Sequence, residues 1–479
     1  MAAIVLIIWT LLILLITTAV RKFNNWWYEP NEKSLAAPLP PGDLGWPIFG
    51  HMYSFLRAYT SSNPNAFTDS YLEKYGKLGL YKTHLFSQPT ILTTSSDAYK
   101  WVTAHGDHFL PGWPDSFNML FGCNSISLLA GDKHKRMKRL TGPSLQGTDT
   151  LARFALQIAE EDVRELETWA REKVINTYDA VTKLIFDRMM KILISCEERS
   201  ELDEIARIFS KFILAVRAIP INLPGTAHHK GLKARQRLRE KLTPVISRRR
   251  AGERKDDVLQ LWMDQSDDDG QPMTDEELLD MIGGYMIAGH TGSALSLTWF
   301  MIFMNEHPEV LEKVRVEAQE VRNTKPPGEP LSYFDTRRLK YLRHVHDEIL
   351  RIVNIAPFTF RKVKETSTIN GFTIPKGWRV QLMSRAIHYD PDIYANPYVF
   401  KPDRWIGRLL KPGQFAAFGE GQRACPGQQF ARLNVVIIAY YLALDYKWEP
   451  LKSTYKTKFL PHPHPTCGYP VKFTRRVCS

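Results

Sequence analysis

The chain has 479 residues, of which 44% are hydrophobic, so it is long enough to bury a sizeable core. Its formal net charge of +12 favours anionic surroundings, such as phospholipid headgroups or an acidic protein partner. Five widely spaced cysteines without a C-x-x-C pair argue against a disulfide framework, and no sequence motif points to nucleic acid as a partner.

The N-terminal segment is uncharged from Ala2 to Val20 and consists mostly of Ile, Leu, Val and Ala. A helix over this range spans about 28 Å, enough to cross the apolar core of a bilayer. Arg21 and Lys22 follow directly, and the aromatic run at 26–28 is typical of a membrane interface. Because no basic stretch precedes the apolar run and no cleavage site is evident, an anchor is favoured over a signal peptide.

Three regions follow from this pattern. We expect a transmembrane anchor at residues 1–22, an interfacial and proline-rich hinge at 23–44, and one large domain at 45–479. The hinge contains Pro38, Pro40 and Pro41, which stiffen the backbone in an extended form. The basic residues behind the anchor place the large domain in the cytosol.

The large domain is expected to be mainly α-helical with small β-sheets. Residues 76–82 and 89–94 read as short alternating strands, and residues 367–380 as a hairpin around the turn signal Asn370-Gly371. Residues 155–173 have apolar side chains at helical spacing, which predicts an amphipathic surface helix. Residues 274–307 are too apolar for a surface helix, so we expect this helix to cross the interior.

A glycine-rich decamer near the C-terminus surrounds Cys425 in the pattern F-x-x-G-x-R-x-C-x-G. A thiolate that binds haem iron needs a bend that presents its sulfur, N–H groups directed at it, and shielding from water. Gly421 and Gly427 would free the backbone for the bend, Phe418 can cover the sulfur, and Arg423 can reach a haem propionate. By chance this pattern would occur in roughly one such chain in ten thousand. A haem-thiolate loop is therefore favoured over an ordinary loop with a buried thiol.

This decamer resembles the haem-binding loop of the cytochrome P-450 superfamily, the haem-thiolate monooxygenases. Two further patterns of that family occur upstream in the expected order: E-x-x-R at residues 348–351 and P-x-x-F-x-P-x-R-W at 397–405. The resemblance extends over nearly all of residues 38–479. It implies the cytochrome P-450 fold, mainly helical with small β-sheets, preceded here by an N-terminal transmembrane helix in the endoplasmic reticulum membrane.

The resemblance also implies haem b as cofactor, with Cys425 as the axial thiolate ligand of the iron. Arg423 and Arg361 are the expected partners of the haem propionates. His134 and Lys138 stand where the family has W-x-x-x-R, and a lysine there supplies a point charge instead of a planar fork.

The helix that carries His134 also carries Lys133, Lys135 and Arg136. We expect these three residues to form a basic solvated face. They also suit a docking surface for an acidic reductase.

Glu348 and Arg351 lie three residues apart and therefore share one face of a helix. The resemblance pairs them with Arg404 in a buried network that supports the haem loop. We expect a structural role, so that their loss prevents haem incorporation.

The long apolar helix departs from the family pattern A-G-x-(D/E)-T-(T/S), because residues 288–293 read A-G-H-T-G-S. Ala288 leaves room for dioxygen, but Thr291 takes the acid position and Gly292 the alcohol position. Three interpretations stay open. In the first, Thr291 or Ser293 supplies the missing hydroxyl after a local helix distortion. In the second, a carboxylate or hydroxyl of the substrate holds the ordered water that delivers protons to dioxygen. In the third, the enzyme rearranges a peroxide and does not activate dioxygen.

Further segments, at 41–47, 111–114, 222–226 and 234–235, resemble a plant branch of the superfamily that oxidises terpenoids and steroids and includes the ent-kaurenoic acid oxidases. An apolar substrate requires an apolar pocket. The candidate lining residues are Phe117, Leu120, Phe212, Ala288, Ile355, Phe358 and Phe459.

We therefore expect a monooxygenase that oxidises a diterpenoid, triterpenoid or steroid. Because the sequence has no flavin or dinucleotide motif, electrons from NADPH should arrive through a separate NADPH-cytochrome reductase. Membrane lipid and an apolar small molecule are the other expected partners. Two alternatives are a haem-thiolate isomerase or dehydratase that needs no reductase, and a haem protein that binds a lipid or gas without turnover.

Overall fold

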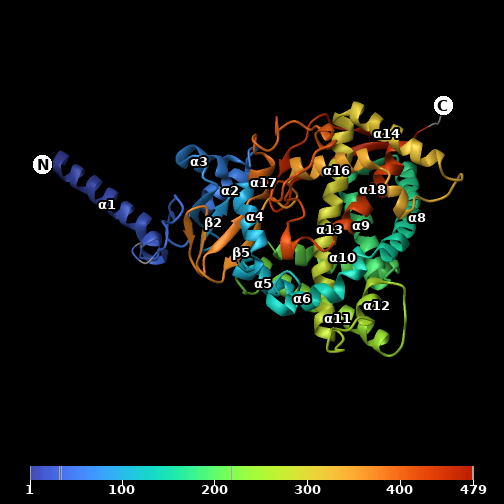
Figure 1. Cartoon of the computed structure of the whole chain (residues 1–479), viewed down its shortest axis with the longest axis horizontal. Helices are drawn as coiled ribbons and strands as arrows, with labels where there is room; N and C mark the ends of the chain where they lie inside the picture. Colours follow the sequence, from blue (N-terminus) through green and yellow to red (C-terminus); the bar gives the residue numbers. More distant parts are fainter. Residues whose placement is uncertain (1, 32, 34, 217, 219, 477–479) are drawn as a thin grey trace. The chain divides into compact units, whose positions relative to one another are not determined.

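The computed structural model of the chain describes residues 2–31, 33, 35–216, 218 and 220–476 (Figure 1). Cys478, one of the five cysteines, lies outside the described residues. The chain divides into two compact units. The first comprises Met1–Trp113, Ala356–Asn396 and Leu410–Ala424, and the second comprises Pro114–Ile355, Pro397–Leu409 and Cys425–Ser479.

The first unit is built on a five-stranded sheet with the strand order β1-β2-β8-β5-β3, and β6 and β7 form a separate pair. Its elements are α1 (Ala2–Tyr28), α2 (Met52–Thr60), α3 (Ala66–Tyr75), β1 (Leu80–Leu85), β2 (Gln88–Thr93), α4 (Ser96–Ala104), η2 (Gly106–His108), β3 (Phe109–Pro111), β5 (Thr359–Val363), β6 (Ser367–Ile369), β7 (Phe372–Ile374), β8 (Arg379–Leu382), α17 (Ser384–His388) and η4 (Gly421–Arg423).

Strand β1 begins later than the sequence pattern predicts, because Gly76 and Gly79 both adopt positive φ and form a turn in front of it. The Gly79 carbonyl accepts a hydrogen bond from the Thr94 N–H (2.8 Å), which closes this turn. The predicted hairpin is confirmed as β6 and β7, with Asn370 and Gly371 at positive φ between them. Strand β8 is not part of that hairpin, because it pairs with β2 and β5.

Helix α1 ends at Tyr28 and is bonded to the segment that follows it. The Asn24 side chain donates to the carbonyls of Leu44 (3.1 Å) and Trp46 (2.5 Å). Among the described residues two helices are long and apolar enough to cross a membrane. One lies within α1, at Leu6–Tyr28, and the other is α13, which is mostly buried inside the protein.

The second unit is mainly helical, with one three-stranded sheet of the order β4-β12-β9 and a two-stranded sheet of β10 and β11. Its elements are α5 (Asp115–Phe121), α6 (Gly131–Thr141), α7 (Pro143–Gln146), α8 (Thr148–Glu172), β4 (Val174–Asn176), α9 (Thr177–Ile194), α10 (Arg199–Ala215), α11 (Ala227–Arg250), α12 (Val258–Met263), α13 (Asp275–Glu306), α14 (Pro308–Asn323), α15 (Tyr333–Thr336), α16 (Lys340–Val353), η3 (Pro402–Trp405), α18 (Gln428–Asp445), β9 (Tyr446–Pro450), β10 (Thr457–Lys458), β11 (His464–Pro465) and β12 (Pro470–Arg475).

Helix α13 is the central helix of this unit, as its apolar composition predicts, and it packs against α9, α16 and α18 (Figure 1). It starts with a capping box, in which the Thr274 side chain accepts from the Glu277 N–H and the Glu277 side chain accepts from the Thr274 N–H. The helix is α-helical without interruption from Asp275 to Glu306. The predicted surface helix 155–173 is part of α8, which begins earlier, at Thr148.

The expectation that helix α6 presents Lys133, Lys135 and Arg136 on one solvated face is wrong for one of the three residues. Arg136 does not belong to a solvated face, because its guanidinium is partly buried between Asp267 (2.5 Å) and Glu277 (2.8 Å). No local sequence pattern indicates these acids, because they lie more than a hundred residues further along the chain. Lys133 and Lys135 are exposed, as expected.

Candidate functional site: a thiolate loop and an open strip of helix α13

Cys425 lies in the second unit, three residues before α18 begins at Gln428. Its side chain is half-buried, and this burial raises the pKa of the sulfur. The backbone N–H of Gly427 donates to the sulfur and opposes that rise in pKa. Such a thiol stays protonated at neutral pH by itself, whereas a bound metal cation would deprotonate it and gain a strong ligand.

The two glycines of the loop have different roles, which corrects the expectation that both form the bend. Gly421 has φ of +69°, and a Cβ there would lie 2.2 Å from the Thr103 carbonyl oxygen, so the bend and the close packing both require glycine. Gly427 has φ of −90°, which any residue can adopt. A Cβ at Gly427 would meet no atom within 4 Å, so the space beside it is open.

One strip of α13 faces open space as well, although most of the helix is buried. Ala288 is exposed, and a Cβ at Gly292, one turn later, would meet no atom within 4 Å. Tyr285, one turn before Ala288, lies close enough to Cys425 for the thiolate charge to raise the pKa of its phenol further. The second unit therefore has open space both beside the thiol loop and along this strip of α13.

The positions around α13 separate the two candidate hydroxyls. At about 100° per residue, Thr291 lies about 60° from Ala288 around the helix, and Ser293 lies about 140° away. Thr291 is half-buried, whereas Ser293 is buried, on the side of α13 that Gly289 and His290 share. Thr291 thus borders the open strip without the helix distortion that the sequence had suggested.

His290 turns away from the open strip toward α9. Its Nε2 lies 3.2 Å from the Thr182 carbonyl oxygen, and its ring is edge-on to Phe186 and Phe209. Burial lowers the pKa of His290 to about 4, against the opposing effect of the Thr182 carbonyl. The imidazole is therefore neutral at physiological pH.

Two arginines of the first unit lie close together in a poorly solvated environment. Arg361, on β5, and Arg423, in η4, each have a lowered pKa. Burial is the main cause for both, and the charge of Arg361 helps to lower the pKa of Arg423 to about 10. Gly112 allows β5 to approach closely, because a Cβ there would lie 2.3 Å from the Arg361 carbonyl. Two repelling guanidinium groups are suited to a ligand with two carboxylates, as haem has.

His134 and Lys138 lie one turn apart on α6 and so share one helix face, as their spacing predicts. His134 is buried and Lys138 is half-buried. Phe418 is half-buried and belongs to the first unit, whereas Cys425 belongs to the second.

Glu348, Arg351 and Arg404 form one buried network in the second unit, with Glu348 and Arg351 fully inaccessible to water. Arg351 donates twice to the Glu348 carboxylate (2.9 Å each), and Arg404 Nε donates once (2.9 Å). The sequence had not indicated two further donors, the Lys401 N–H (2.9 Å) and the Trp405 indole (3.0 Å). The P-x-x-F-x-P-x-R-W pattern contains Trp405, but the pattern does not indicate that its indole binds Glu348.

Some of the candidate pocket residues lie together in the second unit. Phe117 stacks on Phe121 at 3.7 Å, and Phe121 lies 6.1 Å from Phe212 on α10. Leu120 is fully buried, and a Cβ at Gly231 would lie 3.1 Å from it, so Leu120 belongs to the packing between α5 and α11.

The remaining candidates are distributed over both units. Phe358 belongs to an aromatic cluster of the first unit, with ring centroids 5.5 Å from Phe55 and 5.7 Å from Tyr59. Ile355 is buried and Phe459 half-buried in the second unit. An apolar pattern in the sequence did not distinguish these locations.

Each unit, taken by itself, offers groups that suit haem. The second unit offers the half-buried thiol of Cys425, the Gly427 N–H, and open space at Gly427, Ala288 and Gly292. The first unit offers the two repelling arginines described above, which suit the propionates.

Known proteins provide an independent comparison. A family model for cytochrome P-450 matches residues 40–467. Ent-kaurenoic acid oxidase 1 of Arabidopsis thaliana is 36% identical over 455 residues, which cover 93% of each chain. Ent-kaurenoic acid oxidase 1 of Hordeum vulgare is 34% identical over 490 residues, covering 100% of this chain and 98% of its own. Beta-amyrin 11-oxidase of Glycyrrhiza uralensis is 32% identical over 470 residues, covering 96% and 95%.

A solved structure confirms the expected fold, mainly helical with small sheets. Retinoic acid-bound cyanobacterial CYP120A1 superposes with a TM-score of 0.84 at 26% sequence identity, covering 92% of this chain and 100% of that chain. With the family match over residues 40–467, this establishes the assignment that the loop around Cys425 suggested. The chain belongs to the cytochrome P-450 family and is an oxidoreductase of that family.

Proposed function

We propose that this protein is a membrane-anchored haem-thiolate monooxygenase that oxidises a C–H bond of a diterpenoid, triterpenoid or steroid. The observation that carries the chemistry is the Cys425 thiol, which accepts the Gly427 N–H and lies near the turn of α13 that leads to the open strip. The substrate class rests on relatives named for oxidation of ent-kaurenoic acid and beta-amyrin.

In this proposal Cys425 holds the iron, and Arg361, Arg423, His134 and Lys138 hold the propionates. When bound, haem supplies the iron at which dioxygen is reduced. The Gly427 N–H stabilises negative charge on the sulfur, and the partial burial of Cys425 limits the access of water to it. The Glu348 network holds η3 against α16 and supports the loop without contacting the reacting atoms.

The Thr291 hydroxyl is the proton-handling group that the geometry favours, because it borders the open strip. It can accept a hydrogen bond from one water and donate to another at the position where the protons are consumed. Gly292 leaves space for such water or for a polar group of the substrate. Ala288 and Phe117 would contact the apolar body of the substrate, whereas Phe212 is buried and would support Phe117 from behind through Phe121.

We further propose that α1 anchors the protein in the endoplasmic reticulum membrane with the remainder in the cytosol. Electrons from NADPH would come from a separate NADPH-cytochrome reductase. The net charge of +12 suits an acidic partner and an anionic lipid surface.

The testing experiment is a carbon monoxide difference spectrum of the reduced protein in membranes, followed by turnover with NADPH, the reductase and a terpenoid panel. A thiolate-type Soret band with product that requires NADPH supports the proposal. The band with conversion of a hydroperoxide, but without any NADPH-dependent product, would support the isomerase or dehydratase alternative, which Gly292 at the usual alcohol position keeps open. Folded, haem-loaded protein without the thiolate band would contradict the assignment of Cys425.

A further inference from the structure

A cavity of about 170 Å³ lies in the second unit among α15, α16 and α18. The polar residues that line it all carry hydrogen-bond donors: Tyr333, Thr336, Arg337, Arg343, Gln429 and Arg432. No acidic residue is among the described residues that line it. The cavity is several times larger than the roughly 30 Å³ that one water molecule occupies in the liquid.

The positive charge around this cavity is only partly balanced. Arg432 is largely buried and pairs with Asp347 at 2.5 Å. Arg343 is half-buried, and within the part of the chain that the structure describes neither Arg343 nor Arg337 forms an ion pair with a carboxylate. Burial lowers the pKa of Arg343, and the charges of Arg432 and Arg337 lower it further, against the opposing charge of Asp347. Arg337 is exposed at the rim of the cavity, so three guanidinium groups line a cavity in which one carboxylate balances one of them.

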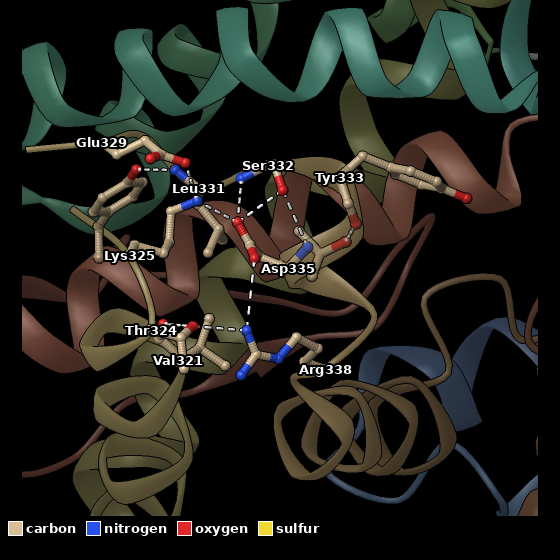
Figure 2. Close-up of polar contacts among 11 residues, drawn as sticks. Val321, Thr324, Lys325, Glu329, Leu331, Ser332, Tyr333, Asp335 and Arg338 are labelled. Carbon is tan, nitrogen blue, oxygen red and sulfur yellow. Dashed lines mark hydrogen bonds and ion pairs between the residues drawn. The ribbon is translucent and has the colours of Figure 1, made fainter.

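The acid nearest in sequence is already engaged elsewhere. Figure 2 shows Asp335 turned toward Ser332, Lys325 and Arg338, while Tyr333 points away from this group. The Asp335 carboxylate lies 2.6 Å from Lys325 Nζ and 2.7 Å from the Ser332 hydroxyl, and it closes a capping box with Ser332. Asp335 therefore stabilises the start of α15 and does not neutralise Arg337.

We infer that this cavity binds a phosphate-type oxyanion, either free phosphate or the phosphomonoester group of a larger molecule. A phosphate has enough acceptor oxygens for several planar guanidinium forks and for the hydroxyl donors beside them. It carries about 1.5 to 2 negative charges at neutral pH, comparable to the excess of positive charge around the cavity. A single carboxylate would leave part of that charge and several donors without an acceptor.

The test uses the full-length, haem-loaded protein and inorganic phosphate, titrated calorimetrically at an ionic strength held constant with chloride. Saturable binding is expected, and Arg343→Gln and Arg337→Gln should each weaken it roughly tenfold, because each removes a charge-assisted contact. Arg338→Gln is the matched control, since Arg338 is a neighbour that donates to Thr324 (2.7 Å) and does not line the cavity. An unchanged carbon monoxide spectrum in all three variants shows that they are folded.

Two probes distinguish the source of the phosphate. Binding of glycerol 3-phosphate indicates a soluble phosphomonoester, whereas binding only to vesicles of phosphatidylcholine that contain phosphatidic acid indicates a lipid headgroup. Absence of saturable phosphate binding by the wild-type protein would overturn the inference. An equal loss of affinity in Arg338→Gln, or tighter binding of an oligoglutamate peptide than of any phosphate probe, would overturn it as well.

Discussion

Two regions of the second unit differ in how closely they keep the residue pattern of the family: the region around Glu348 keeps it, and residues 288–293 do not. Around Glu348 the carboxylate oxygens are used by protein donors, and no part of the side chain reaches water. Along residues 288–293 of α13 the family pattern is altered, and Ala288 and Gly292 face open space. The first region is defined by partners within the chain, whereas the second is defined by whatever occupies the space beside it. The second region therefore tolerates changes of sequence that would break hydrogen bonds in the first.

The largest expected effect is that of Glu348→Gln. Its carboxylate accepts from Arg351, Arg404, Lys401 and Trp405, and an amide nitrogen in its place would face donors. Breaking a buried ion pair costs about 3–5 kcal/mol, a large share of the roughly 5–15 kcal/mol that stabilises a typical domain. We expect little or no haem-loaded protein, measured as the ratio of haem to protein and by urea denaturation.

The matched control is Asp403→Asn, next to Arg404 in the sequence. Asp403 pairs with Lys313 at 2.9 Å at the surface, and such exposed pairs contribute at most about 1 kcal/mol. This variant should retain haem. A Glu348→Gln protein with the wild-type haem content and urea midpoint would show that the network does not support the loop.

The altered region of α13 is tested by Thr291→Val, which removes the hydroxyl and nearly keeps the shape. Loss of a proton-transferring group typically lowers a rate by two orders of magnitude or more, and water can replace part of that function. We expect product per NADPH consumed to fall roughly ten- to a hundredfold, while haem content stays unchanged.

Two further variants sharpen this result. Ser293→Ala should change product yield less than about twofold, because Ser293 lies on another side of the helix. Adding Gly292→Thr to Thr291→Val should recover part of the yield, since a side chain at 292 meets no atom within 4 Å of its Cβ. A strong effect of Ser293→Ala with none from Thr291→Val would reverse the assignment of the hydroxyl.

These two regions also differ in how far they could be predicted from the sequence. Local sequence is enough to predict that Glu348 and Arg351 share a helix face and that residues 274–307 form an interior helix. Both predictions are confirmed. The distinction between Thr291 and Ser293 needs the orientation of α13 within the protein, which the local sequence does not determine. The ion pairs of Arg136 depend on acids far along the chain, and no local pattern reveals them.

The paired arginines of the first unit provide an intermediate case, since they repel each other but suit an anionic ligand. Arg361→Gln removes one charge beside Arg423. We expect haem affinity to fall roughly tenfold through loss of a charge-assisted contact, while the haem-free protein becomes more resistant to urea. Haem release and urea unfolding of the haem-free form measure the two effects.

A fall in haem affinity together with a rise in the urea resistance of the haem-free protein would identify Arg361 as a propionate partner. The control is Lys362→Gln, the exposed neighbour on the same strand, which should change neither quantity. If Arg361→Gln destabilised the haem-free protein, its guanidinium would be part of the fold and not a site for a propionate.

The smallest effect at neutral pH is expected for His290→Phe, because this side chain points toward α9 and away from the open strip. Its pKa is lowered from 6.5 to about 4 in the folded protein, so the folded state favours neutral imidazole. The stability that depends on the neutral form is fully present above pH 6.5 and declines as the pH falls from 6.5 to 4, by up to about 3 kcal/mol. Urea unfolding at intervals over this range should show a shallower acid decline in His290→Phe than in the wild type.

His105→Gln, at an exposed histidine, should follow the wild-type curve. Identical acid curves for His290→Phe and the wild type would mean that His290 is not held neutral, and a loss of turnover at neutral pH would place this side chain in the proton path instead of Thr291.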